Sequence, residues 1–232
     1  MIQGDDMNLW AKTIGTVAVA GLAVAATTSF AAPAPEAQAT ANLIKQLDSI
    51  QSITANFSQT TKATNGKQPA KKGLTAQHMN QTFTGLMKVE RPGKFYWQTT
   101  SPAKQTIITS GKTVWIYDPD LQQVVKQTLD DQVANTPALL LSGNAQQIMQ
   151  AYRVTQPDSR KTYYTLYPKN KDGAFESLTI SFGAKSAPTL MILQDSLGQT
   201  THVRFSGTQL NTQIPASTFN FTVPKGADVI EQ

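Results

Sequence analysis

The chain has 232 residues, with 20 lysines and arginines against 15 aspartates and glutamates, so its net charge at neutral pH is +5. A chain of this length holds one domain or at most two. The complete absence of cysteine excludes disulfides, thiol chemistry and acylation at an N-terminal cysteine, so the chain is not itself a lipoprotein.

The N-terminal region has the pattern of a secretory signal peptide. Lys12 precedes an unbroken small and apolar run over residues 13–26, which is too short to span a bilayer comfortably because a spanning helix takes roughly 20 residues. We expect Met7 to be the working start, since the acidic residues before it are unfavourable for export. A retained membrane anchor is the alternative interpretation.

Two cleavage sites fit the small-x-small rule, in which the last and the third-last leader residues are small: Ser29-Phe30-Ala31, cut after Ala31, and Ala37-Gln38-Ala39, cut after Ala39. Residues 1–39 thus comprise the signal peptide and a short linker rich in proline and alanine. Residues 40–232 are expected to form a single domain in the bacterial periplasm, where a chain of this size can build a sufficient core without disulfides.

The exported part of the chain is more basic than the whole. Without residues 1–39, which hold one lysine and three acidic residues, 19 basic residues face 12 acidic ones. Nucleic acid is not an expected partner of an exported protein. Much of the charge lies in "KATNGKQPAKKG" at residues 62–73, including Lys67 to Lys72, where glycine and proline predict a loop. Docking on an acidic or anionic partner remains the alternative role of this loop.

The first expected element after the leader is a helix over residues 40–52. Leu43, Leu47 and Ile50 recur at spacings of four and three, so they share one helix face. Thr40 is a suitable N-cap residue.

Short alternating runs then predict a train of antiparallel strands, because turn residues such as "SPAK", "SGK" and "DPDL" divide them. The expected strands cover residues 53–61, 82–90, 94–100, 105–111, 113–119, 122–129, 152–156, 162–169, 175–183, 189–196, 201–211 and 218–223. We take about eleven of these as true strands, together with two to three helices. The predicted fold is a mainly β protein: an incomplete antiparallel β-barrel with a helical cover.

A helical insert interrupts the strands at "NTPALLLSGNAQQIMQAY". Thr136 is expected to cap this insert, with Pro137 at its first helical position. Leu139, Leu140 and Leu141 form a compact apolar cluster. A barrel of about eleven strands is too wide for its own side chains to fill, so this insert and the first helix are candidates for a lid.

Residues for catalysis or metal binding are scarce. His78 lies near the basic stretch and His202 in a predicted strand, and no nucleophile, phosphate-binding or zinc motif occurs. Asp118 and Asp120 read as an ordinary turn, and Asp130 and Asp131 as complements to the dipole of the insert. The sequence therefore predicts a protein that is not an enzyme and uses no metal or cofactor.

Large apolar and aromatic side chains are spread through the strands and the insert, as in a hydrophobic core or a cavity for an apolar ligand. They are Phe95, Trp97, Ile107, Trp115, Tyr117, Leu139, Leu140, Leu141, Phe182 and Met191. For any one residue, packing into the core is the simpler role; as a set beneath a lid, they suggest a cavity.

Three ordered blocks, "RPGKFYWQTTSP", "SGKTVWIYDPDLQQV" and "NTPALLLSG", resemble the LolA family of outer-membrane lipoprotein carrier proteins, as does the closing "PASTFNFTVPKGADVI". The resemblance covers about residues 40–230 and departs from the family in the longer stretch at residues 62–81. The absent lipidation cysteine separates the chain from the related receptor LolB.

The resemblance implies a periplasmic chaperone that takes lipoproteins from the inner-membrane ABC transporter LolCDE and passes them to LolB at the outer membrane. It implies that Arg91 latches the lid, that Phe95 lies at the cavity mouth and that Trp97 points inward. Ile107, Trp115, Tyr117, Leu43 and Leu47 are expected to line the lipid site with the three leucines of the insert. We expect a monomer.

Two further classes remain open. A periplasmic binder of free fatty acids or other small lipids would need the same apolar interior. A purely structural module would fill its interior with its own side chains, and a hydrolase is disfavoured because no nucleophile and base are paired.

Overall fold

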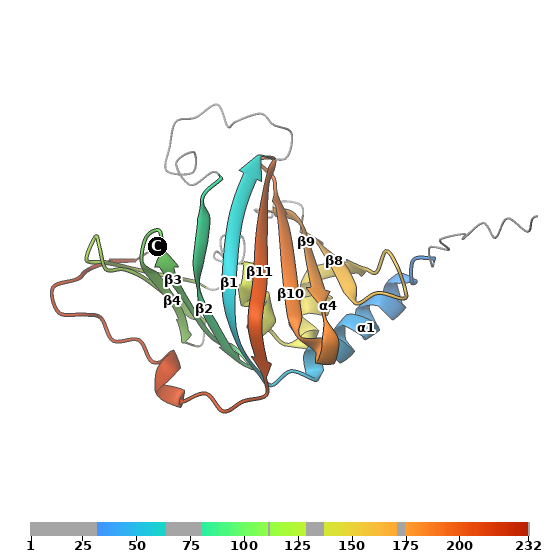
Figure 1. Cartoon of the computed structure of the whole chain (residues 1–232), viewed down its shortest axis with the longest axis horizontal. Helices are drawn as coiled ribbons and strands as arrows, with labels where there is room; N and C mark the ends of the chain where they lie inside the picture. The colour runs from blue at the N-terminus through green and yellow to red at the C-terminus, as the bar shows by residue number, and fades with distance from the viewer. Residues whose placement is uncertain (1–31, 64–79, 111, 129–136, 171–174, 232) are drawn as a thin grey trace, which may run out of the picture. The chain divides into compact units, whose positions relative to one another are not determined.

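The computed structural model of the chain describes residues 32–63, 80–110, 112–128, 137–170 and 175–231 (Figure 1). The predicted signal peptide, most of the basic stretch, His78, Asp130, Asp131 and Thr136 lie outside these residues. None of the helices in the described ranges is long and apolar enough to cross a membrane.

Within the described residues, twelve strands form one open sheet in the order β12-β6-β5-β4-β3-β2-β1-β11-β10-β9-β8-β7, which confirms the mainly β prediction. The strands are β1 (Ser52–Ala63), β2 (Thr82–Glu90), β3 (Lys94–Ser101), β4 (Gln105–Ser110), β5 (Thr113–Asp118), β6 (Gln123–Thr128), β7 (Tyr152–Thr155), β8 (Tyr163–Pro168), β9 (Phe175–Phe182), β10 (Pro188–Asp195), β11 (Gln199–Leu210) and β12 (Asp228–Glu231).

Most neighbouring strands are consecutive in the chain, but two pairings are not. β1 pairs with β11 along ten residue pairs, and the two strands run side by side in the centre of Figure 1. β12 pairs with β6 in parallel, so the sheet is not wholly antiparallel as expected. The pairing of β1 with β11 joins the first meander, β1 to β6, to the second, β7 to β11. The pairing of β12 with β6 adds the last strand to the far end of the first meander.

The prediction of a strand over residues 218–223 is wrong. A short 3-10 helix, η3 (Ala216–Phe219), occupies its first half, and the twelfth strand forms later, at β12. Pro215 and Pro224 bracket the segment and have no N–H to donate to a neighbouring strand. Phe219 is buried and Phe221 stacks on Trp115, so the segment holds to the sheet through side chains instead of backbone pairing.

The helices are α1 (Glu36–Asp48), α4 (Ala145–Ala151) and the 3-10 helices η1 (Pro137–Ser142), η2 (Ala184–Ser186) and η3. α1 starts earlier than expected, because Pro35 precedes it with an extended backbone and the helix begins at once. Thr40 is therefore not the N-cap: its Oγ1 donates to the backbone oxygen of Glu36 at 2.9 Å, inside the helix. The insert forms as expected, although its first part is a 3-10 helix.

Both faces of the first meander are covered. Trp97, Ile107 and Ile116 lie opposite one another on β3, β4 and β5, and all three belong to or pack against the main core. Their neighbours Ile108 and Trp115 form the adjacent cross-strand pair, so they face the other way. We call the side of the sheet with Trp97, Ile107 and Ile116 the inner face, and the side with Ile108 and Trp115 the outer face.

A stack of aromatic rings stabilises the inner face where β1, β2 and β3 meet. The ring of Phe57 stacks on that of Trp97 with centroids 3.6 Å apart, and Phe95 follows at 6.1 Å from Trp97. Phe57 lies opposite Gly85, where a Cβ atom would come within 2.7 Å of the Phe57 ring. Glycine at this position therefore leaves the space that the aromatic stack occupies.

Candidate functional site

Three helical elements, α1, η1 and α4, bury apolar side chains against the inner face of the sheet. One hydrophobic cluster joins Ala39, Leu43 and Leu47 of α1 and Ile148 of α4 to the strands. The predicted interior residues that belong to this cluster are Leu43, Leu47, Phe95, Trp97, Ile107, Leu139, Leu140, Leu141, Phe182 and Met191. The cover and the sheet thus share one continuous apolar interior.

Trp115 and Tyr117 do not belong to this interior, so the prediction that they line it is wrong. They lie on the outer face, where Phe221 stacks on Trp115 with ring centroids 5.4 Å apart and lies 6.2 Å from the ring of Tyr117. Their neighbours Val114 and Ile116 take the inner positions instead.

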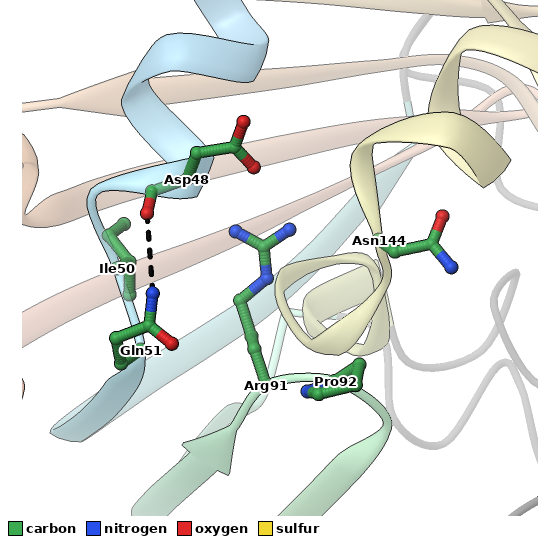
Figure 2. Close-up of a pocket in the computed structure, with 6 residues that line it drawn as sticks. All are labelled: Asp48, Ile50, Gln51, Arg91, Pro92 and Asn144. Atoms are coloured by element: carbon green, nitrogen blue, oxygen red, sulfur yellow. Dashed lines mark hydrogen bonds between the residues drawn. The ribbon is translucent and has the colours of Figure 1, made fainter.

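Arg91 connects the two parts of the cover. It follows β2 directly, and its Nε donates to the backbone oxygen of Gly143, between η1 and α4, at 3.0 Å. The same guanidinium donates through a terminal nitrogen to the backbone oxygen of Leu47 in the last turn of α1. Figure 2 shows the side chain rising from the β2–β3 turn between α1 and the segment that carries Asn144.

The backbone around Arg91 holds the same two segments. The N–H of Arg91 donates to the oxygen of Gln51 at 2.8 Å, just after α1, and the N–H of Gly93 donates to the oxygen of Ser142 at 2.8 Å. Gly93 has a positive φ of 78°, a conformation that glycine adopts without strain. The tight turn therefore brings one side chain and two backbone donors to the edge of the cover.

The electrostatics favour a cation at this place. The last carbonyls of a helix lack partners inside the helix and carry partial negative charge, which suits a guanidinium at Leu47. Burial lowers the pKa of Arg91, while the nearby carboxylate of Asp48 raises it. An arginine side chain stays protonated at neutral pH despite such a shift, so its charge is retained.

A small pocket opens beside the guanidinium, lined by Asp48, Ile50, Gln51, Arg91, Pro92 and Asn144 (Figure 2). Its volume is about 170 Å³, below the roughly 300–1,000 Å³ typical of ligand pockets. On its wall the side-chain amide of Gln51 donates to the backbone oxygen of Asp48 at 3.4 Å. This pocket is therefore too small to hold a long acyl chain.

The polar residues singled out in the sequence serve the fold. Asp118 Oδ1 accepts the backbone N–H groups of Asp120 and Leu121 at 3.0 Å each, which closes a turn. His202 lies on β11 opposite Thr60, and burial lowers its pKa. Among the described residues, no group of three or more histidine, cysteine or acidic side chains is placed to hold a metal ion.

A protein-family model described as "Outer membrane lipoprotein carrier protein LolA" matches residues 48–222. The chain belongs to the LolA family. A relative from Pseudomonas fluorescens (strain Pf0-1), named "Outer-membrane lipoprotein carrier protein", is 41% identical over 193 residues, 83% of this chain and 88% of its own length. A relative of the same name from Hahella chejuensis is 39% identical over 224 residues, 95% of this chain and 99% of its own length.

Among solved structures, a LolA superfamily protein from Nitrosomonas europaea aligns with 81% of this chain and 99% of its own, at 14% identity and a TM-score of 0.48.

Sequence reasoning missed several residues that build the LolA-family interior here. Phe57 stacks directly on Trp97, and its alternation with Ile53 and Ala55 was a signal for the inner face. The acceptor oxygens of Leu47 and Gly143 had no sequence signal, because any residue carries a carbonyl.

Proposed function

We propose that this LolA-family chain carries outer-membrane lipoproteins through the periplasm and shields their acyl chains against the inner face of the sheet. The observation that carries the proposal is the position of Arg91, whose guanidinium joins α1 to the segment between η1 and α4 above an apolar interior. The names of the relatives in Pseudomonas fluorescens and Hahella chejuensis support the same cargo class.

The energetics of the cargo explain why a carrier is needed. Burial of one methylene group is worth about 0.8 kcal/mol, so one acyl chain of about 15 methylenes carries roughly 12 kcal/mol. A lipoprotein with up to three chains therefore cannot leave a membrane for water unaided, because the free energy of exposing its chains is too high. An apolar interior makes the transfer nearly neutral, and an energy source is needed to load the carrier.

The cover has two tasks in this scheme. When the carrier is empty, it keeps the large apolar surface away from water, which prevents aggregation. When acyl chains enter, they take the place of Leu43 and Leu47 of α1 and the leucines of η1, and the bonds of Arg91 break. The guanidinium is thus proposed as a latch, since its rigid fork of donors can hold two carbonyls at once.

The proposed partners follow from the family. The ABC transporter LolCDE loads the carrier at the inner membrane, and the receptor LolB unloads it by binding the chains more tightly. Removal of the N-terminal leader after export releases a single carrier domain, which acts as a monomer in the periplasm. No catalytic step is needed at any stage.

The direct test is to add the purified protein to spheroplasts, in which the outer membrane and periplasm are removed, and to measure the release of soluble lipoprotein. We expect release that saturates with added protein, with each released lipoprotein in a complex with the carrier. No release above a buffer control contradicts the proposal. Recovery of free fatty acid alone in the purified complex supports the lipid binder instead.

A further inference from the structure

The linker ahead of α1 is built into the fold. The N–H of Ala34 donates to the backbone oxygen of Gln156 at 3.1 Å in an antiparallel bridge, next to the edge strand β7. Two residues earlier, the backbone oxygen of Ala32 accepts the N–H of Ser159 at 3.4 Å. Residues 32–34 therefore run along residues 156–159 in the opposite direction, and this register places Ala32 beside Asp158.

The residues that follow this linker are structural as well. Ala34 packs against the main core, and Ala39, in the first turns of α1, is fully buried in it. The backbone N–H of Ala39 also donates to the oxygen of Pro35 at 2.8 Å. Cleavage after Ala39 removes the start of α1 and a core residue, whereas cleavage after Ala31 leaves all of these contacts in place.

Asp158 has an incomplete set of partners. It is 5% exposed, and its Oδ1 accepts the backbone N–H and the Nε of Arg160 at 3.0 and 3.4 Å. Its other oxygen, Oδ2, is buried without a hydrogen-bond partner among the described residues, and the Nζ of Lys161 lies 4.0 Å away. A buried acceptor without a donor is costly, so this oxygen indicates a place for a further cation or donor.

We propose that the leader is removed after Ala31 and that the new α-ammonium group of Ala32 pairs with the carboxylate of Asp158. In the uncut chain, the nitrogen of Ala32 is a neutral amide with one N–H. Cleavage turns it into a cation with three donors, and the backbone register sets its residue beside Asp158, whose Oδ2 lacks a donor in the described part of the chain. The free N-terminus then fastens the linker, and with it the start of α1, to the loop after β7.

The inference rests on the proposed export but not on the proposed cargo. The first test is the intact mass of the protein purified from the periplasm. A chain that starts at Ala32 supports the proposal. A chain that starts at Thr40 overturns it, and so does a chain that keeps its leader. Both outcomes leave export intact, because the protein is recovered from the periplasm.

The second test measures the pKa of the α-amino group of the mature protein, by NMR after ¹³C-dimethylation, which retains the charge. An opposite charge within about 4–6 Å favours the ammonium form and raises its pKa by about one unit or more, so its proton affinity rises at least about tenfold. The exposed cations Arg160 and Lys161 oppose this rise. We expect a value above the usual range of about 7.7–8.0.

The matched variants are Asp158→Asn and Asp120→Asn, of which the second removes an exposed carboxylate in another turn. Asp158→Asn is expected to return the α-amino pKa to its usual range, and Asp120→Asn to leave it raised. If the mature protein itself has a usual pKa, the pairing is refuted whether or not the Asp158 variant folds.

Discussion

Arg91 is the residue on which the cover depends, because it bonds to two segments that are 96 positions apart in sequence, at Leu47 and Gly143. Arg91→Leu removes both bonds while it keeps an apolar stem. We expect the variant to fold and to take up cargo, but to hand it to the receptor slowly. The lost bonds lower the stability of the closed, empty state by about 1–3 kcal/mol, or roughly 5- to 150-fold in its ratio to the open state.

The measurement is the rate of lipoprotein transfer from loaded carrier to receptor, with Arg204→Leu as the control because Arg204 is an exposed arginine on β11, between the core residues Val203 and Phe205. Arg91→Lys keeps the charge but loses the fork, so its rate should lie between those of the wild type and Arg91→Leu. Transfer by Arg91→Leu at the wild-type rate contradicts the latch.

Gly85 tests the aromatic stack at the same scale. A Cβ atom there would lie 1.8 Å from the backbone oxygen of Gln98 and 2.7 Å from the ring of Phe57, so Gly85→Ala forces strand and ring apart. We expect a loss of about 1–3 kcal/mol in the free energy of unfolding, measured by urea titration. Gln81→Ala, at an exposed position just before the same strand, should change it by less than about 0.5 kcal/mol.

Residues differ in how well the sequence predicts them. Family likeness predicts the latch role of Arg91, and alternation together with family likeness predicts that Phe95 and Trp97 point inward. Helical spacing predicts the shared buried face of Leu43 and Leu47. Trp115 and Tyr117 were misplaced because Val114 and Ile116, their neighbours on β5, are also apolar. When both faces of a strand are covered, alternation no longer tells which face is inside.

At the scale of elements, the segment from Asn211 to Ala227 covers the outer face while α1, η1 and α4 cover the inner one. Phe221→Ala uncovers Trp115 and Tyr117 without touching the interior. We expect faster quenching of tryptophan fluorescence by iodide and a loss of stability of about 1–2 kcal/mol, because Phe221 is only half buried. Transfer of lipoprotein should stay at the wild-type rate.

The comparison variant is Phe57→Leu, which alters the inner face but keeps a large apolar side chain. It is expected to change the transfer rate. A slow Phe221→Ala carrier with intact secondary structure argues that the outer face takes part in transport, which is contrary to the proposed function.

Elements were predicted best where their signals are local. The strands from β1 to β11 follow from alternation and turn residues, but the start of α1 was misjudged because Pro35, outside the expected helix, decides where it begins. The sequence did not predict β12. Its four residues, DVIE, are all exposed, so they do not show the alternation of apolar and polar residues that marks a half-buried strand.

At the scale of the whole molecule, β12 forms one border of the sheet, and it is a short edge strand with an acidic residue at each end. It pairs with β6, and Lys126 of β6 donates to Glu231 at 2.9 Å. A chain that ends at Ala227 leaves the polar backbone edge of β6 uncovered, and such edges pair with other chains. We expect this truncated protein to fold but to self-associate, as measured by sedimentation velocity over a range of concentrations.

The control for the truncation is Lys126→Gln in the full chain, which removes the exposed ion pair and keeps β12. It should stay monomeric, because exposed pairs contribute little. A truncated chain that remains monomeric at high concentration indicates that β6 needs no cover.

The order of strands could not be predicted from local signals. β1 pairs with β11 at Thr61 and Thr201, which are 140 positions apart, and the sequence of neither strand indicates its partner. The hairpins fix the strand order within β1 to β6 and within β7 to β11, but the pairing of β1 with β11 joins these two meanders and depends on the whole fold.

The open border between β7 and β12 has a mechanical consequence. The strand order places them at opposite ends of the sheet, so moving them apart breaks no ladder of hydrogen bonds among the twelve strands in the described residues. The resistance is elastic, since it comes from bending and twisting of strands that remain paired. A closed barrel has a fixed girth, whereas this sheet can widen gradually, so one carrier is expected to serve lipoproteins with different numbers of acyl chains.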